Sequence, residues 1–168
     1  DDNPIELSTI NPGYVLGPIL DKNFSASGEI IRKLMRHDLP GCPDLDLPVV
    51  DVRDVANAHI AAMTIPRAAG MRFCCVAENG TMQEIAIIIN KHFADKVYKA
   101  PTWKMPNIMV RLAAVFDKTV RLIVNDLGRR VKISNVRIKE VLDWEPHSLE
   151  EKVVAMAESM IKYGIVSE

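Results

Sequence analysis

Residues 11–18 read Asn-Pro-Gly-Tyr-Val-Leu-Gly-Pro, so prolines and glycines fill half of these positions. Pro12 has no N–H group but keeps a carbonyl that can accept a hydrogen bond. Gly13 and Gly17 permit close approach of other backbone atoms. The preceding residues 5–10 alternate apolar and polar side chains, which predicts a β-strand. We therefore expect residues 11–18 to form the loop that leaves the carboxyl end of this strand.

Segments typical of strands and helices alternate after this loop. The pattern predicts strands at residues 47–50 and 72–76, and helices that begin near Ser27, Val55 and Thr81. Ser27 and Thr81 are expected to cap their helices through side-chain oxygen atoms. Strands followed by helices in this order predict an α/β fold with a largely parallel sheet.

The last third of the sequence is mostly helical in character. An apolar stripe at helical spacing runs through residues 108–123, and a short edge strand is predicted at 129–133. Residues 148–151 begin with Ser and end with Glu, the pattern of a capping box that starts a final helix. We expect residues 1–100 to contain the α/β units and residues 101–168 to form a helix-rich lobe.

Composition limits the classes of partner. The 168 residues are 48% hydrophobic and 26% charged, with a net charge of −1, which is typical of a folded domain. This charge gives no footprint for nucleic acid or for a membrane surface, and no apolar run approaches the roughly 20 residues of a spanning helix. Cys42, Cys74 and Cys75 lack metal-ligand spacing, so we expect no metal and reduced thiols in a cytoplasmic protein.

Three motifs in a consistent order carry a family resemblance. They are residues 11–18, the stretch Val-Asp-Val-Arg-Asp-Val-Ala-Asn-Ala-His at 50–59, and Trp-Glu-Pro followed by Ser-Leu-Glu-Glu within 144–151. With them, nearly the whole chain resembles the C-terminal half of an extended short-chain dehydrogenase/reductase of the dihydroflavonol 4-reductase-like branch. The resemblance implies the C-terminal part of an NAD(P)-binding Rossmann-like fold with a substrate-binding lobe.

The resemblance also implies site residues. Contacts to the nicotinamide would fall on four consecutive positions, which are Pro12, Gly13, Tyr14 and Val15. Ser27 would contact the cofactor phosphates, and Tyr14 and Leu16 would lie on the substrate side. Taken without the resemblance, a plain turn at 11–18 and a plain helix cap at Ser27 are the simpler interpretations.

The second motif is interpreted as structural. Asp51 and Asp54 suit a junction between a strand and a helix, where a carboxylate can accept hydrogen bonds from free N–H groups, and Arg53 can pair with either. A catalytic pair of carboxylates is the alternative. His59 is expected to be a buried or boundary histidine rather than a base.

Two motifs that the family needs for hydride transfer do not occur in this sequence. They are a Gly-rich phosphate loop and a Tyr-x-x-x-Lys pair, and in the family both precede the strand expected at residues 5–10. We therefore assign no catalytic residue to this chain. The expectation is a fragment, inactive alone, of an NADP- or NAD-dependent reductase that acts on a ketone or aldehyde and includes a missing N-terminal half.

Other parents and assemblies stay open at this stage. A sugar-nucleotide epimerase or dehydratase is one alternative, although that branch usually carries a different sequence at residues 11–13. A non-catalytic NAD(P)-sensing or interaction domain is another. Strands that lack their neighbours would leave an exposed sheet edge, so we expect the chain to form a homodimer or to rearrange.

Overall fold

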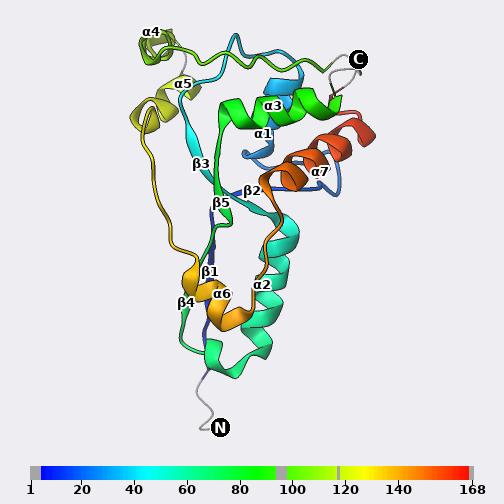
Figure 1. The fold of residues 1–168 in the computed structure, drawn as a ribbon, viewed down its shortest axis with the longest axis vertical. Coiled ribbons are helices and arrows are strands. Elements are labelled where there is room, and N and C mark those ends of the chain that lie inside the picture. The colour runs from blue at the N-terminus through cyan, green and yellow to red at the C-terminus, as the bar shows by residue number, and fades with distance from the viewer. Residues whose placement is uncertain (1–4, 94–97, 117, 167–168) are drawn as a thin grey trace.

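The structure is a computed structural model that describes residues 5–93, 98–116 and 118–166. The strands are β1 (Thr9–Pro12), β2 (Tyr14–Leu16), β3 (Asp46–Asp51), β4 (Arg72–Cys75) and β5 (Glu78–Thr81). The helices are α1 (Gly28–Met35), α2 (Val52–Thr64), α3 (Met82–Phe93), α4 (Asn107–Phe116), α5 (Lys118–Ile123), α6 (Val136–Leu142) and α7 (Leu149–Lys162), with 3-10 turns η1 (Pro66–Ala68) and η3 (Val124–Asp126). Figure 1 shows an elongated molecule in which β1, β4, α2 and α6 occupy one end and α1, α3 and α7 the other.

The strands form two small sheets rather than one. In the first sheet β1 pairs with β4 in parallel, and in the second β2 pairs in parallel with β3, whose other edge pairs antiparallel with β5. The first strand was expected at residues 5–10 but runs over Thr9–Pro12, because its partner β4 spans only four residues. The α/β class is confirmed, while the expected loop at 11–18 contains the end of β1 and all of β2.

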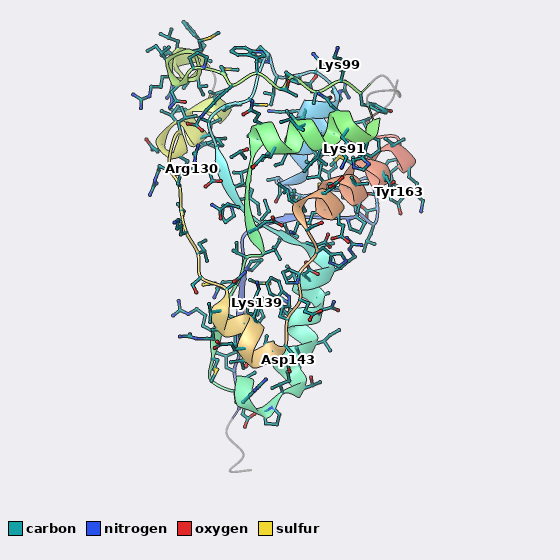
Figure 2. The ribbon with its side chains drawn as sticks, viewed as in Figure 1. Lys91, Lys99, Arg130, Lys139, Asp143 and Tyr163 are labelled. Carbon is teal, nitrogen blue, oxygen red and sulfur yellow. The ribbon has the colours of Figure 1, made fainter. Side chains whose placement is uncertain are left out.

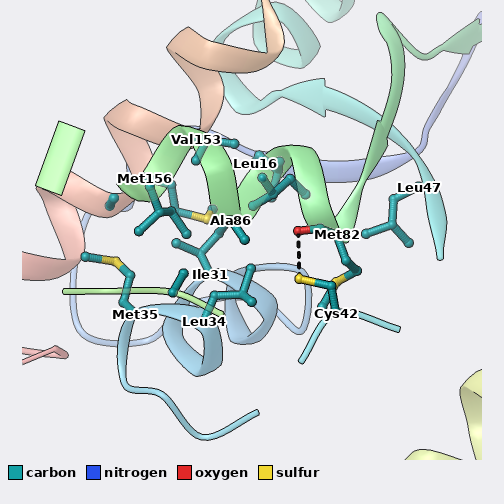
Figure 3. Close-up of a cluster of buried hydrophobic side chains, with 14 of the residues drawn as sticks. Leu16, Ile31, Leu34, Met35, Cys42, Leu47, Met82, Ala86, Val153 and Met156 are labelled. Atoms are coloured by element: carbon teal, nitrogen blue, oxygen red, sulfur yellow. Dashed lines mark hydrogen bonds between the residues drawn. The ribbon is translucent and has the colours of Figure 1, made fainter. Parts of the chain in front are cut away.

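The larger hydrophobic core lies between β2, β3 and the helices α1, α3 and α7. Figure 3 shows its centre, where Ile31 and Leu34 of α1 face Ala86 of α3. The Cys42 thiol donates a hydrogen bond to the carbonyl of Met82 at 3.6 Å, and burial raises the pKa of Cys42 to about 11. Capping boxes predicted at the starts of α3 and α7 are confirmed by the reciprocal hydrogen bonds of Thr81 with Glu84 and Ser148 with Glu151, respectively.

A second core lies at the other end of the molecule. Phe73 and Cys75 of β4 pack there with Ile138 of α6 and with Trp144. Cys74 is exposed while Cys75 is buried, so the two adjacent cysteines face opposite sides of the strand as expected. Each of the two cores combines residues from before and after residue 100.

Three features of the last two thirds of the sequence were not expected. β5 was missed because Glu-Asn-Gly-Thr has low strand propensity, and it forms through its antiparallel register with β3. Residues 129–133 form no strand; instead the carbonyl of Val131 accepts a hydrogen bond from the side chain of Asn79. The apolar stripe of 108–123 is largely exposed. No helix in the described ranges is long and apolar enough to cross a bilayer.

A buried lysine fastens α7 to the second sheet. Lys152 is 0% exposed, and its ammonium donates hydrogen bonds to Glu78 Oε1 at 3.0 Å and to the carbonyl of His147. A buried cation needs such partners because desolvation penalises its charge. The contact therefore fixes the start of α7 relative to β5.

We expect Lys152→Met to lower the free energy of unfolding by about 2 kcal/mol, since the hydrogen bonds are lost but the apolar stem is kept. For a chain of this length that corresponds to a fall in Tm of about 4–8 °C. Calorimetry or thermal circular dichroism measures the change. Lys139→Met, at an exposed lysine on α6, is the matched control and should shift Tm little; equal shifts would contradict the role of Lys152.

Candidate functional site

The motif at residues 11–18 lies where the chain crosses from the first sheet to the second. Gly13 links β1 to β2, and a Cβ atom at this position would come within 2.2 Å of the carbonyl oxygen of Pro48 in β3. Its N–H donates to the carbonyl of Cys75 at 3.2 Å, which keeps it on the first sheet. Only glycine fits at this crossing. Gly13, which the resemblance assigned to nicotinamide contact, is therefore also required by the packing of β1 and β2 against β3.

The carbonyl of Pro12 lies on the open edge of β1. The N–H groups of Thr9 and Gly13 donate to carbonyls of Met71 and Cys75 on the β4 side. Backbone groups of alternate residues point to opposite sides of a strand, so those of Pro12 point away from β4. No strand in the described part of the chain pairs with that side. Pro12 therefore offers a hydrogen-bond acceptor to whatever lies beside β1.

β2 separates two hollows. Tyr14, which is 40% exposed, lines a hollow of about 170 Å³ together with Leu47 of β3, Ile123 of α5 and Arg129. Val15 borders a second hollow of about 340 Å³, whose wall is mostly residues 15–25 and which reaches Val52 and Met156. Adjacent strand residues face opposite sides, which explains why Tyr14 and Val15 face different hollows.

Of the remaining two predicted site residues, Leu16 also borders the second hollow, whereas Ser27 lines neither hollow. Leu16 is 2% exposed and packs in the larger core, so its side chain contributes to packing rather than to an open surface. Ser27 precedes α1 but does not cap it, because its own backbone is already helical, with φ −65° and ψ −38°. That predicted cap is wrong. Within the described residues, no hydrogen bond to the Ser27 hydroxyl is found.

Asp51 supports the end of the motif. Its buried carboxylate accepts hydrogen bonds from the backbone N–H and the guanidinium of Arg53, each at 2.8 Å. Gly17 has φ +101°, and a Cβ atom there would lie 2.7 Å from Oδ1 of Asp51. Burial alone would raise the pKa of Asp51, but the hydrogen bonds from Arg53 outweigh it and hold the pKa below its ordinary value.

Asp54 joins the second motif to the third. Its carboxylate is buried and accepts hydrogen bonds from the backbone N–H of His147 at 2.9 Å and contacts Nδ1 of His147 at 2.6 Å. The indole of Trp144 donates to the carbonyl of Asp54 at 3.0 Å. The structural interpretation of residues 51–59 thus agrees with these contacts. Sequence analysis missed His147, whose place directly after Trp-Glu-Pro was the available signal.

His59 and a third hollow lie apart from this site. His59 is exposed rather than in the core or at its boundary as expected, and its Nδ1 contacts the carbonyl of Val55 at 2.8 Å. It lines a hollow of about 480 Å³ between the start of β1 and α2, with Ser8 and Met63. This hollow is larger than the two beside β2, but none of residues 11–18 lines it. Among the described residues, no group of three or more His, Cys, Asp or Glu side chains could hold a metal ion.

Comparison with curated proteins finds reductases. NADPH-dependent methylglyoxal reductase GRE2 of Saccharomyces cerevisiae is 28% identical over 170 residues, which cover 97% of this chain and 45% of that protein. Ketoreductase azaE of Aspergillus niger is 35% identical over 129 residues, which cover 71% of this chain and 38% of that protein. No family model matches the chain.

Solved structures give the same result. The crystal structure of Gre2 in complex with NADPH from Candida albicans is similar with a TM-score of 0.69 and 29% identity, covering 97% of this chain and 46% of that one. The chain belongs to the extended short-chain dehydrogenase/reductases. It spans less than half the length of the curated relatives described above.

In this dehydrogenase/reductase chain, we expect Gly17→Ala to lower the free energy of unfolding more than Gly70→Ala does. Both glycines have positive φ, but a Cβ at Gly70 would meet nothing within 4 Å. Gly70→Ala should therefore cost only the strain of a positive φ, about 1 kcal/mol, whereas Gly17→Ala adds a clash with Asp51 of about 1–3 kcal/mol. Urea unfolding compares the two; equal losses would show that Asp51 does not support the motif.

The Asp51 carboxylate should also make stability depend on pH. Its pKa is lower in the fold than its ordinary value of 3.8, so the ionised group stabilises the fold above that value and the contribution is lost as pH falls further. We expect Asp51→Asn to reduce unfolding free energy by about 2 kcal/mol at pH 7. Urea unfolding from pH 7 to pH 3 should show this difference shrinking below about pH 4; a constant difference would contradict the assignment.

Proposed function

We propose that this chain forms the nicotinamide-side loop and the substrate pocket of an NAD(P)H-dependent reductase that acts on a ketone or aldehyde. The observation that carries the proposal is the open-edge carbonyl of Pro12, placed directly before a strand that has a hollow on each side. The reductase relatives support the same choice, and GRE2 is named as NADPH-dependent.

The residues present fit a nicotinamide cofactor. A nicotinamide ring carries a flat carboxamide, and its N–H groups need an acceptor such as the Pro12 carbonyl. The backbone at Gly13 has no side chain to block approach, and Val15 adds an apolar contact beside a hollow. The Ser27 hydroxyl makes no cap hydrogen bond at the start of α1, so it is available to a phosphate oxygen. When bound, such a cofactor supplies the hydride.

The hollow beside Tyr14 suits a substrate with an apolar group next to its carbonyl. Leu47 of β3 and Ile123 of α5 provide much of its apolar wall. The phenol of Tyr14 lies two residues after Pro12, so it is placed to orient a carbonyl compound beside the cofactor loop. Arg129 and Asp126, which pair at 3.1 Å, also line the hollow, as does Asp46, whose carboxylate accepts a hydrogen bond from the Asn79 amide at 2.7 Å.

The proton donor and the phosphate loop are assigned to another part of the same enzyme. This sequence contains neither a Tyr-x-x-x-Lys pair nor a Gly-x-Gly-x-x-Gly loop. General acid catalysis needs a donor within hydrogen-bond distance of the carbonyl oxygen. In the proposal, this chain binds and orients the reactants and shields them from water, and the remainder of the enzyme completes the reaction.

The test uses the full-length protein that contains this chain, assayed for NADPH oxidation with aldehydes and ketones. We expect turnover, whereas the 168 residues alone should give none. In the full-length protein, Tyr14→Ala should raise the KM for the carbonyl substrate about tenfold, with a smaller change in the KM for NADPH. Tyr163→Ala, at a tyrosine that follows α7, is the matched control (Figure 2).

Two results would overturn the proposal. One is conversion of UDP-sugars by the full-length protein without reduction of any aldehyde or ketone, which would favour an epimerase or dehydratase. The other is NADPH binding without turnover of any of these substrates, which would favour a sensing or interaction domain.

A further inference from the structure

Helix α4 is apolar on two opposite sides. Val110 and Ala114 are buried against the rest of the chain. The opposite side presents large apolar side chains to solvent, which are Ile108, Met109, Leu112, Val115 and Phe116. Phe116 is 92% exposed. A helix with apolar residues all round is normally buried, so its outer side has the character of a contact surface.

The apolar surface continues onto α5. Leu122 is exposed, while Ile123, its neighbour, packs toward the larger core. Figure 1 shows α4 and α5 together at one corner of the molecule, away from α2 and α6. We call the exposed side chains of α4 together with Leu122 the outer apolar face. Within the described chain, nothing covers it.

Positive charge is concentrated in the same segment. Residues 104–132 contain seven Lys or Arg and two acidic residues, although the whole chain has a net charge of −1. In the described part of the chain, carboxylates pair with Arg129 and Arg130 but not with Arg111 or Arg121. Figure 2 shows Arg130 close to α5 at this corner. The near-neutral net charge therefore hides a strongly basic segment.

Two of these arginines border a hollow next to the outer apolar face. The hollow measures about 320 Å³, and its wall includes Arg111 and Val115 of α4, Arg121 of α5 and Asn125. The guanidinium of Arg121 donates to the carbonyls of Ala114 at 3.2 Å and Val115 at 3.3 Å, which holds it at the end of α4. Cations beside exposed apolar side chains match a ligand surface that has anionic groups above an apolar layer.

We propose that α4 and α5 bind the surface of an anionic lipid membrane. The outer apolar face enters the boundary between headgroups and acyl chains, and the hollow between Arg111 and Arg121 takes a lipid phosphate or carboxylate. Interfacial helices combine these two features, and basic residues strengthen the attraction to anionic lipids. A second copy of the chain fits less well, because a twofold contact would place the same cationic surfaces against each other.

The test measures sedimentation of the 168-residue chain with vesicles. We expect binding at least tenfold tighter to vesicles of phosphatidylcholine and phosphatidylserine in equal parts than to phosphatidylcholine alone, and weaker binding as salt is raised. Leu112→Glu and Arg111→Glu should each weaken binding to the anionic vesicles about tenfold. Met63→Glu changes an even more exposed apolar side chain on α2 and should leave binding unchanged; circular dichroism checks that each variant folds.

Four outcomes would overturn the membrane proposal. Equal binding to neutral and anionic vesicles, or binding unaffected by Leu112→Glu, would remove the role of this face. Concentration-dependent dimers in light scattering that Leu112→Glu abolishes would make the face a contact between two copies. Failure of the full-length protein to bind vesicles that the 168 residues do bind would mean that the rest of the enzyme covers the face. None of these results depends on reductase activity.

Discussion

The arrangement of the candidate site depends on one buried carboxylate, that of Asp51. It ends β3, accepts an N–H group in the first turn of α2, pairs with the guanidinium of Arg53 and occupies the space that Gly17 leaves open. Burying a charged group is costly unless it is paired and hydrogen-bonded. Arg53 of the second motif offsets this cost, and Gly17 of the first motif leaves room for the carboxylate. The loop that offers Pro12 and Val15 is thereby tied to the start of α2.

A second buried carboxylate, that of Asp54, lies three residues after Asp51 and joins α2 to the third motif. Asp54 contacts His147 and accepts the indole N–H of Trp144 through its carbonyl, and the carbonyl of His147 in turn accepts from Lys152. These contacts join segments more than 90 positions apart in the sequence into one hydrogen-bonded unit. Removing one member leaves a buried polar group without its partner, which is more costly than losing an exposed ion pair. This gives a physical reason for three motifs that look unrelated along the chain to occur together.

Sequence patterns predicted the parts of this fold that rest on local rules. The capping boxes at Thr81 and Ser148, and the opposite orientations of Cys74 and Cys75, follow from neighbouring residues alone. β2 was missed because it has only three residues and β5 because its residues have low strand propensity, and both form through pairing with β3, which lies between them. The functional residues were located only in part. The motif at 11–18 was found, but His147 acts through its contact with Asp54, which is distant in sequence. Arg121, beside the outer apolar face, acts through hydrogen bonds to carbonyls at the end of α4 that no sequence pattern indicates.

The apolar stripe at 108–123 shows a different limit. Periodicity shows that a helix has an apolar side, but α4 has two, and only packing decides that Val110 faces inward while Leu112 faces out. The carboxylate of Asp44 helps to set which side of α4 faces inward. It pairs with Lys104 at 3.1 Å and Arg130 at 2.6 Å and so holds both ends of the segment beside β3. Ile123 in this segment also lines the hollow beside Tyr14. A contact at the outer apolar face would therefore act, through Ile123, on a wall of the proposed substrate pocket.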